Sequence, residues 1–486
     1  MKTLMVQGTG SGVGKTTLVA ALCRLFRRRG LRVAPFKAQN MSNNAHVCRD
    51  GGEIGRSTAL HALACGIEPT VEMNPVLLKP ATDVDAQVIL MGRPVRAMSA
   101  VEYQREKPRL LGVIRECLDT LRRSYDLVIL EGAGSPAEVN LREGDLVNMA
   151  AAELADAPVL LAGDIDVGGV FAQLVGTLHL LLPKERERVK GFLINKFRGD
   201  LSILKPGLDF LERETSRPVL GVVPWYRGIH LPEEDALSGR ERKNGGERLR
   251  IDVLLQPRMA NFTDFDALEA EPDVELRYRE TPDGTTPDAY VLPGTKSTIA
   301  DLRRLKEAGW AEPLRNALSL GGTVVGLCGG YQMLGRHVAD PEGVESATRG
   351  EDGLGLLPVT TTFSAGKVTA RVRGVHLDTG AEIEGYEIHM GRTVSDGEPA
   401  LRISERGGVS CADFDGARAF GGRAWGTYVH GLFDRPGFRR AFLNRLRAAR
   451  GWRPLETSAA WDPDRELDRL ADHVGAHVDL DRITSL

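Results

Sequence analysis

The sequence predicts an α/β protein with two domains, the first built on a parallel sheet and the second carrying a β-rich insertion. Short apolar runs such as TLMVQG, YDLVILEG and APVLLAGDID alternate with longer helical patterns, and strands separated by helices form parallel sheets. A polar, charged stretch, EEDALSGRERKNGGERLR, interrupts this pattern near the middle of the chain. The length, 486 residues, also exceeds that of one ordinary domain.

The order of these patterns divides the chain into four parts. A first α/β domain over residues 1–230 is followed by an interdomain linker over 231–250, where no apolar periodicity places residues in a core. A second α/β domain covers 251–450, and the alternation in TTTFSAGKVTARVRGV predicts antiparallel strands within it. Residues 451–486 form a helical tail, which we expect to be one amphipathic helix packed on the body of the protein.

The composition excludes several classes of protein. A formal net charge of −3 provides no basic footprint for nucleic acid or for an anionic membrane surface. The six cysteines are scattered without a C-x-x-C pair, which argues against a zinc site or a disulfide framework and favours a reducing cytoplasm. The N-terminus has no signal-peptide pattern, and no run of eighteen apolar residues occurs. We expect a cytoplasmic protein with no nucleic-acid partner and no membrane insertion.

A glycine-rich loop, GTGSGVGKTT over residues 8–17, follows the first predicted strand and opens a helix. In this context backbone N–H groups wrap phosphates, the lysine reaches the β and γ phosphates, and the following hydroxyl binds Mg²⁺. The loop is one residue longer than the common G-x-x-x-x-G-K-[ST] form, because Thr9 occupies the usual first-glycine position. The predicted ATP-binding residues here are Gly8, Gly12, Gly14, Lys15, Thr16 and Thr17.

This longer loop resembles the dethiobiotin synthetase branch of the P-loop proteins, whose loops read GT-x-x-x-VGKT. The resemblance implies that Glu131, after the strand LVILE, binds Mg²⁺ together with Thr16. It also implies that Asn195 in LINKF recognises the nucleotide base, although a simple turn residue is an equally good interpretation of that asparagine.

The stretch VVGLCGGYQML, residues 324–334, places a cysteine between glycines where a strand gives way to a helical pattern. This is the G-x-nucleophile-x-G elbow, in which glycines permit a strained turn and the helix N-terminus favours a negatively charged nucleophile. Cys328 is therefore a candidate nucleophile. The alternative is a buried structural cysteine, the commoner case for a cysteine taken at random.

A nucleophilic cysteine needs a base and an oxyanion hole. In VLPGTKST, Gly294 follows a predicted strand, and its region can supply a backbone N–H to pair with that of Gly329. His430 in TYVHGLF lies at the distance from the cysteine where amidotransferases carry their catalytic imidazole. Together these residues resemble a class I glutamine amidotransferase domain.

One member of that family's triad is absent at its usual place. Class I domains usually carry an acid two residues after the histidine, and Leu432 stands there. We expect a dyad of Cys328 and His430, with Glu387 in GYEIHMG as a weakly supported candidate for orienting the imidazole.

The two halves together resemble the cobyrinic and cobyric acid amidating enzymes, and within them the cobyric acid synthase family. The motifs that carry this resemblance are FKAQNMSNNA, MNPVLLKP, EGAGSPAEVNL, DLVNMA, GDIDVGGVFAQL and GYEIHMG. The resemblance implies ATP- and glutamine-dependent amidation of the b, d, e and g carboxylates of adenosylcobyrinic acid a,c-diamide, with Mg²⁺ as cofactor. ATP would activate each carboxylate as an acyl phosphate, and glutamine hydrolysis at Cys328 would supply ammonia.

The same resemblance suggests substrate-binding residues near the first domain's strand ends. Lys37, at the end of the second predicted strand, is placed to bind phosphate or a substrate carboxylate. Asn40, Asn43 and Asn44 could hydrogen-bond corrin amides, with Asx-turns as an equally good interpretation.

Two other functions remain as alternatives. The sister enzyme, cobyrinic acid a,c-diamide synthase, shares both domains. A positioning ATPase of the same P-loop superfamily is disfavoured because Gly10 precedes Ser11 where such proteins carry a signature lysine, and because it has no use for Cys328 or His430.

Overall fold

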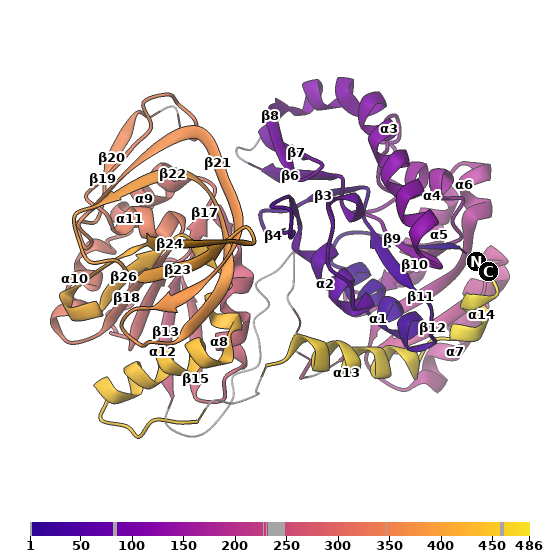
Figure 1. Cartoon of the computed structure of the whole chain (residues 1–486). Coiled ribbons are helices and arrows are strands. Elements are labelled where there is room, and N and C mark those ends of the chain that lie inside the picture. The colour runs from indigo at the N-terminus through magenta and orange to yellow at the C-terminus, as the bar shows by residue number, and fades with distance from the viewer. Residues whose placement is uncertain are drawn as a thin grey trace. The chain divides into compact units, whose positions relative to one another are not determined.

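The computed structural model describes residues 2–80, 85–226, 228, 229, 231, 248–346, 348–456 and 461–486. The chain forms two compact units of mixed α/β structure, so the predicted fold class is confirmed (Figure 1). The first unit comprises Met1–Ser42, Glu53–Asp235 and Asp462–Leu486, and the second comprises Asn43–Gly52 and Ala236–Trp461. Most of the expected linker, residues 231–250, lies outside the described residues.

The first unit is built on a six-stranded sheet in the order β12-β11-β10-β1-β9-β2, and every neighbouring pair is parallel. Its strands are β1 (Thr3–Gly8), β2 (Val33–Phe36), β9 (Leu127–Glu131), β10 (Val159–Asp164), β11 (Val189–Phe197) and β12 (Val219–Pro224). Because all six strands run the same way, the residues that follow them gather along one edge of the sheet.

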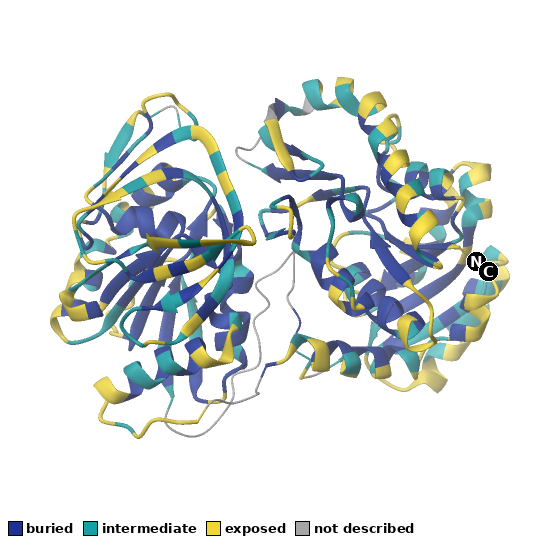
Figure 2. Ribbon diagram, in the orientation of Figure 1, coloured by how far each residue is buried: buried dark blue, intermediate teal, exposed yellow. Residues whose placement is uncertain are grey.

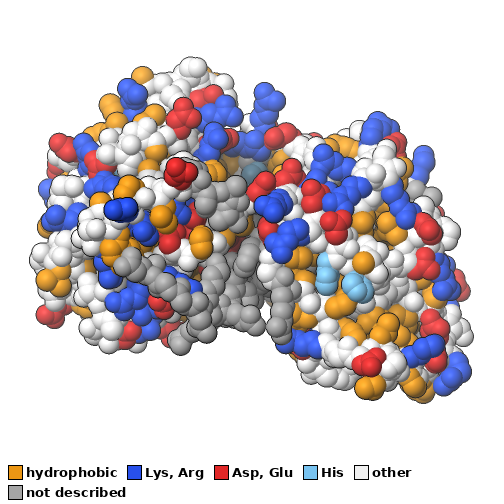
Figure 3. All heavy atoms as spheres, turned by 90° about the horizontal axis from the view of Figure 1, so that it is seen from below, with side chains coloured by type: hydrophobic (Ala, Val, Ile, Leu, Met, Phe, Trp, Pro, Cys, Tyr) orange, Lys and Arg blue, Asp and Glu red, His pale blue; other side chains and the backbone are white. Residues whose placement is uncertain are grey.

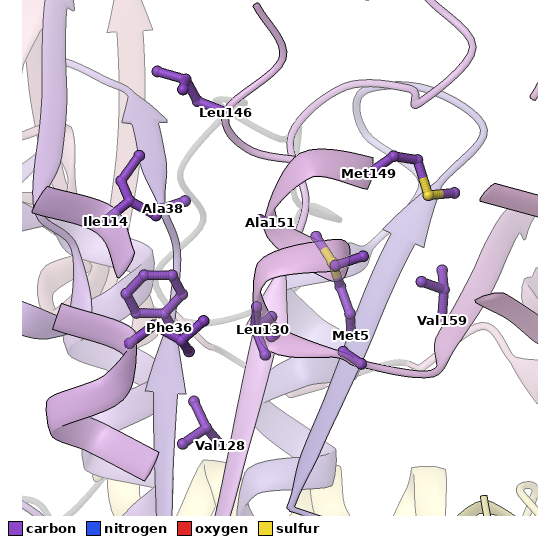
Figure 4. Packing of buried hydrophobic residues seen from close by; sticks show 14 of the residues in the cluster. Met5, Phe36, Ala38, Ile114, Val128, Leu130, Leu146, Met149, Ala151 and Val159 are labelled. Atoms are coloured by element: carbon purple, nitrogen blue, oxygen red, sulfur yellow. The ribbon is translucent and has the colours of Figure 1, made fainter. Parts of the chain in front are cut away.

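Helices cover both faces of this sheet. They are α1 (Lys15–Arg28), α2 (Arg56–Cys65), α3 (Ala100–Ser124), α4 (Met149–Ala155), α5 (Val170–Leu180), α6 (Pro183–Arg188) and α7 (Leu201–Thr215). Met5 of β1 points into the cluster that contains Ile114 of α3 and Met149 of α4 (Figure 4). Leu4 and Val6 join the cluster on the opposite face, which includes residues of α1. This alternation along a fully buried strand is what a sheet covered on both faces requires.

A smaller sheet in the first unit was not predicted. It has the order β3-β6-β7-β8, with β3 (Gln39–Met41), β6 (Val76–Pro80), β7 (Asp85–Leu90) and β8 (Arg93–Ser99). The first pair is parallel and the other two are antiparallel. A buried ion pair at 2.5 Å joins Lys79 of β6 to Glu53 of β5 (Glu53–Gly55), and the short helix η1 (Val71–Met73) precedes β6.

The C-terminal tail belongs to the first unit and differs from the expected single helix. It contains α13 (Pro463–Gly475) and α14 (Leu480–Thr484). α13 packs along α1, and Arg28 of α1 pairs with Asp468 at 2.8 Å and Asp472 at 2.5 Å (Figure 1). The tail therefore supports the helix that begins at the glycine-rich loop.

The second unit has a six-stranded sheet in the order β15-β13-β16-β18-β26-β25, parallel except for the last pair. Its strands are β13 (Leu249–Leu254), β15 (Val274–Arg279), β16 (Ala289–Leu292), β18 (Thr323–Leu327), β25 (Ala417–Ala419) and β26 (Ala424–Thr427). One face carries α9 (Thr298–Glu307), α10 (Ala311–Ser319) and α11 (Gly329–Leu334), and the other carries α8 (Asp266–Ala270) and α12 (Pro436–Ala449). Buried strands and half-exposed outer helices are visible in Figure 2.

The predicted antiparallel insertion is present as a second sheet in this unit. Its path is β20-β19-β21-β22-β27, extended by β23 and β24. The strands are β19 (His337–Ala339), β20 (Gly350–Asp352), β21 (Val359–His376), β22 (Glu382–Ser395), β23 (Leu401–Arg406), β24 (Val409–Asp415) and β27 (Val429–His430). Short elements complete the unit: β4 (Ala45–Val47), β14 (Met259–Ala260), β17 (Gly294–Thr295), η2 (Phe262–Phe265), η3 (Phe420–Gly422) and η4 (Leu432–Asp434).

The molecular surface mixes charges of both signs. Lys and Arg side chains are interspersed with Asp and Glu on the face seen in Figure 3, in keeping with the small net charge. Among the described helices, none is long and apolar enough to cross a membrane.

Candidate active sites

The glycine-rich loop connects β1 to α1, as the motif predicts. Gly12 and Gly14 have φ values of 73° and 93°, a conformation that side chains rarely adopt. A Cβ on Gly8 would approach Val13 to 2.5 Å, so that position also has no room for a side chain. The loop therefore needs its glycines for local geometry, and α1 begins directly behind it at Lys15.

Lys15 and Thr16 lie at this loop with partners of their own. Lys15 donates from Nζ to the carbonyl oxygens of Gly10 at 2.8 Å and Gly134 at 3.1 Å. Thr16 donates from Oγ1 to Oε1 of Glu131 at 2.7 Å. The structure thus brings together the hydroxyl and the carboxylate that the resemblance assigned to a metal ion.

Two basic side chains lie beside the Glu131 carboxylate, which is 2% exposed. Nζ of Lys37 lies 3.3 Å from Oε2, and Nδ1 of His61 lies 3.9 Å from it. Burial acts to raise the pKa of Glu131, but Lys37 and His61 outweigh it, together with the hydrogen bond from Thr16, so the pKa lies below its usual value. The carboxylate is therefore held in the charged form that a divalent cation requires.

Thr16 and Glu131 fit a magnesium ion, because both are oxygen donors at the edge of the sheet beside a phosphate loop. Mg²⁺ commonly takes one or two protein oxygens and completes its shell with phosphate oxygens and water. Within the described parts of the chain, no group of three or more His, Cys, Asp or Glu residues comes together as an all-protein metal site.

Asn195 contacts the loop itself. Its Nδ2 donates to the carbonyl oxygen of Val13 at 2.9 Å, while base recognition by this residue stays a prediction. The neighbouring Lys196 was missed: it has a φ of 60°, and its Nζ donates to Gly12 O and Asp164 Oδ2, both at 2.7 Å. Its unusual backbone has no signal in the sequence.

The four predicted substrate residues fall in different units. Lys37 follows β2 and Asn40 lies in β3, both in the first unit, where Asn40 donates to Ser57 Oγ at 3.4 Å. Asn43 and Asn44 belong to the second unit. The substrate roles of all four stay predictions.

The expected elbow is present around Cys328, between β18 and α11. Cys328 has φ 50° and ψ −107°, a strained conformation for a residue with a side chain. A Cβ on Gly326 would come within 2.7 Å of the backbone of Gly330, and one on Gly330 would collide with the carbonyl group of Leu292. Glycines on both sides of the cysteine are therefore required by the close approach of backbone segments.

His430 has a carboxylate partner that the sequence did not predict. Its Nδ1 lies 2.7 Å from Oδ2 of Asp264, and the backbone N–H of Gly431 donates to Oδ1 of the same carboxylate at 2.8 Å. Asp264 lies on η2, far from His430 in the sequence, so no motif spacing points to it. The expectation of an unassisted Cys-His dyad does not match this geometry.

The electrostatics of this group follow from its burial. Desolvation acts to lower the pKa of His430, which is 1% exposed, but the charge and hydrogen bond of Asp264, together with Cys328, raise it to about 10. With Nδ1 bonded to Asp264, Nε2 is left for the cysteine. The arrangement is that of a nucleophile, a base and an orienting acid.

Glu387 does not take the orienting role suggested for it. This residue, 2% exposed, accepts from Arg406 at 3.1 and 3.2 Å and sits opposite Val429 in the β22–β27 pairing. Its buried charge is matched by the guanidinium of Arg406, not by the imidazole of His430.

The two predicted oxyanion-hole glycines flank Cys328. A Cβ on Gly294 would lie 3.6 Å from the Cβ of Cys328 and 2.9 Å from Cε1 of His430. A Cβ on Gly329 would lie 3.0 Å from the backbone N of Thr295. The backbones of β17 and α11 thus meet at the nucleophile, and the role of their N–H groups stays a prediction.

Comparison with known families defines the class of protein. Residues 4–237 match the model described as the CobQ/CobB/MinD/ParA nucleotide binding domain. Residues 250–438 match the model described as the CobB/CobQ-like glutamine amidotransferase domain. The chain is therefore a nucleotide-binding domain joined to a glutamine amidotransferase domain, and its nucleotide-binding domain implies use of ATP.

Full-length relatives narrow the class to one family. A protein named cobyric acid synthase from Pelotomaculum thermopropionicum is 51% identical, with 100% of this chain and 96% of the relative covered. Proteins of the same name from Syntrophobacter fumaroxidans and Roseiflexus castenholzii are 48% and 49% identical, covering 99% and 98% of this chain and 97% and 96% of the relatives. The chain belongs to the cobyric acid synthase family, which confirms the resemblance noted in its motifs.

Proposed function

We propose that this protein amidates the b, d, e and g side-chain carboxylates of adenosylcobyrinic acid a,c-diamide to give adenosylcobyric acid, using ATP and L-glutamine in the cytoplasm. The observation that carries the proposal is the presence, in one chain of this family, of a complete phosphate loop and a Cys328–His430–Asp264 group. One site activates a carboxylate and the other releases ammonia.

The geometry of the second unit supports the following route for glutamine hydrolysis. His430 takes the thiol proton as Sγ of Cys328 attacks the side-chain amide carbon of glutamine, and the resulting oxyanion is stabilised by backbone N–H groups near Gly294 and Gly329. His430 gives a proton to the departing ammonia, and the sulfur remains bound as a thioester. A water molecule, deprotonated by His430, then hydrolyses the thioester to glutamate and frees the cysteine. Asp264 holds the imidazole in orientation and stabilises its charged form.

The first unit makes the substrate carboxylate reactive. A carboxylate is a poor electrophile, so one of its oxygens attacks the γ phosphorus of ATP, and ADP departs as an acyl phosphate forms. Ammonia attacks the acyl carbon, a proton is lost, and inorganic phosphate leaves. Lys15 and the loop N–H groups hold the phosphates, while Thr16 and Glu131 would hold Mg²⁺, which neutralises charge on the phosphate oxygens. Lys37, beside Glu131, orients the transferring phosphate or the substrate carboxylate.

Two alternatives are weaker. A positioning ATPase has no use for the paired Cys328 and His430. Cobyrinic acid a,c-diamide synthase shares the same two chemistries, and the full-length similarity to proteins named cobyric acid synthase favours the later amidations.

The deciding experiment offers the purified protein two corrinoids separately, adenosylcobyrinic acid a,c-diamide and cobyrinic acid, each with ATP and glutamine. We expect mass spectrometry to show four carboxylate-to-amide conversions of the first compound, with matching release of ADP and glutamate. Amidation of cobyrinic acid at the a and c positions alone would assign the sister activity instead.

A further inference from the structure

A short segment at the start of the chain contributes to the glutaminase unit. After β3 the chain leaves the first unit, residues Asn43–Gly52 pack in the second unit, and the chain returns to the first unit at Glu53. We call residues 43–52 the excursion. Its sequence was singled out above for a role in substrate binding, so its place in the second unit needs another explanation.

The excursion bonds to the turn that carries the catalytic acid. Oδ1 of Asn44 accepts from the backbone N–H of Phe262 at 3.1 Å, and the backbone N–H of Ala45 donates to Oδ1 of Asn261 at 3.0 Å. Asn261 is the N-cap of η2 and has a φ of 53°, so the turn begins with a strained residue. Two residues beyond Phe262, Asp264 binds Nδ1 of His430.

The excursion also reaches the other side of the imidazole. Arg371 of β21 donates from Nε to the carbonyl oxygen of Val47 at 2.9 Å, and its Nη2 lies 3.4 Å from Nε2 of His46. The His46 ring lies 6.0 Å from the ring of Tyr386, which in turn stacks on His430 at 5.5 Å with an interplanar angle of 23°. One segment therefore contacts the turn that carries Asp264 and also lies beside Tyr386, the ring stacked on the catalytic histidine.

Asn44 supplies a hydrogen bond at the start of this turn. η2 is a single short helix with no side-chain cap on its own N-terminus, and its first backbone N–H is satisfied by Asn44 from a distant part of the chain. Asn44 is 2% exposed, so water cannot replace its oxygen without rearrangement. The position of Asp264 therefore depends on a hydrogen bond supplied by the excursion.

We propose that Asn44 is a positioning residue for glutamine hydrolysis: it fixes the η2 turn so that the Asp264 carboxylate meets His430. This inference rests on the proposed glutaminase activity and deepens it. The side-chain oxygen of Asn44 accepts from Phe262 N–H, two residues before Asp264. It acts through Asp264, and this distinguishes it from a residue that merely stabilises the fold.

The test measures kcat and KM for glutamine hydrolysis in the full-length protein. Asn44→Leu keeps the approximate size but removes the acceptor for the Phe262 N–H, and we expect kcat to fall roughly 100-fold, as misplacement of a catalytic group by about 1 Å can do, with KM little changed. Asn44→Asp keeps an acceptor oxygen and is expected to hydrolyse glutamine at least about tenfold faster than Asn44→Leu. Arg49→Ala, on the exposed part of the excursion, is the matched control and should behave as wild type.

A double-mutant cycle separates positioning from general stabilisation. If Asn44 acts through Asp264, then Asn44→Leu combined with Asp264→Asn should be no slower than Asp264→Asn alone. The inference would be overturned if the loss of kcat in the double variant equalled the product of the two single losses. It would also be overturned if Asn44→Leu had the kcat of wild type. Should Asn44→Leu fail to fold, the kcat values of Asn261→Gly and Asn261→Asp are compared instead. Glycine and aspartate both tolerate the positive φ at this position, but only aspartate keeps the acceptor for Ala45 N–H. Equal kcat values for that pair would count against the proposal.

Ammonia-supported amidation of the corrinoid, measured on the same preparations, keeps the two proposals apart. Its absence in wild type alongside normal glutamine hydrolysis would overturn the corrinoid assignment and leave the Asn44 result standing. Equal glutaminase kcat in wild type and Asn44→Leu would overturn the role of Asn44 and leave the corrinoid assignment standing.

Discussion

The two candidate active sites differ in how their polar side chains are held. At the phosphate loop, Lys15 donates to the carbonyls of Gly10 and Gly134, and Thr16 donates to Glu131, so groups meant for a ligand are bonded to the protein. In the second unit, Asp264 and His430 already stand in the arrangement that catalysis uses. If the proposed nucleotide and metal bind here, these bonds would have to be exchanged, whereas the proposed triad needs no such exchange. Substitutions should therefore separate the two sites cleanly.

The largest expected effect is that of Cys328→Ser. We expect glutamine-supported amidation to be abolished and ammonia-supported amidation to remain largely intact, because the sulfur serves only to release ammonia. The measurement is corrinoid amidation with each nitrogen source at saturating ATP. An equal loss of both activities would contradict the division into two sites.

Lys15→Ala should remove amidation from either nitrogen source, since the acyl phosphate is needed however the ammonia arrives. Loss of a charge on the phosphates should cost roughly several kcal/mol of transition-state stabilisation. Lys205→Ala, an exposed lysine of the same unit, is the control. Product formed with ammonia by the Lys15 variant would show that the loop does not activate the carboxylate.

Asp264→Asn should slow glutamine hydrolysis by up to about 10⁴, the cost of removing the orienting acid from a full triad. The pKa of His430 should fall, because Asp264 is what raises it, so the alkaline limb of the pH–rate profile should move to lower pH. Kinetics across a pH series check both effects, with the exposed Asp396→Asn as control. A wild-type rate of glutamine hydrolysis in Asp264→Asn would favour the earlier expectation that Cys328 and His430 act without an orienting acid.

Glu387→Gln tests the residue first suggested for that role. We expect kcat for glutamine hydrolysis to stay close to wild type, while the free energy of unfolding falls by about 1–3 kcal/mol, because a buried partner of Arg406 loses its charge. Burial and the charge of Glu387 raise the pKa of Asp415 to about 6, so this variant should also lower that pKa. A kcat as low as that of Asp264→Asn would mean that both acids orient His430.

The smallest effect concerns pH and the stability of the second unit. Burial, with Arg445 and Arg418 nearby, lowers the pKa of His376 to about 4, and burial does the same for His389. The unfolded chain binds protons near the usual pKa, so each histidine alone lowers the unfolding free energy by about 1.4 kcal/mol per pH unit below about pH 6.5. Asp415 and Glu345, whose pKa values burial raises to about 6 and about 7, act in the opposite sense, so the histidine contribution is measured as the difference between wild type and a histidine variant. Urea unfolding at pH 7, 6 and 5 measures the slope, and His376→Asn should reduce it. The same pH dependence in His376→Asn and wild type would contradict the expectation.

Both candidate active sites could be predicted in part, because each contains a motif of consecutive residues. The loop around Lys15 and the elbow around Cys328 depend on backbone geometry within a few residues, and glycine spacing records such geometry directly. Asp264, in contrast, reaches His430 from a short turn elsewhere in the chain, and a single aspartate before a helix carries no local signature. His61 of α2 was missed for the same reason, because its contact with Thr16 depends on how α2 packs.

The fold, like the sites, could be predicted only in part from the sequence. Alternating apolar runs and helical patterns indicated the parallel sheets, because buried parallel strands are apolar throughout. The division into units was harder: the excursion and the tail cross between units, and nothing in their composition says which core they join. Asn44 was noticed for its amide, but its partner could only be known once the second unit was seen.

The excursion has a consequence for gene architecture. A gene split at the linker would produce two polypeptides, and the one carrying Cys328 and His430 would lack residues 43–52. That half would keep its nucleophile and base yet lose the acceptor for Phe262 N–H, so an independently expressed glutaminase half should hydrolyse glutamine at least about 100-fold more slowly until the other half is supplied. The second unit is therefore not encoded by one continuous stretch of sequence. Recombination that moved only residues 236–461 would omit residues 43–52.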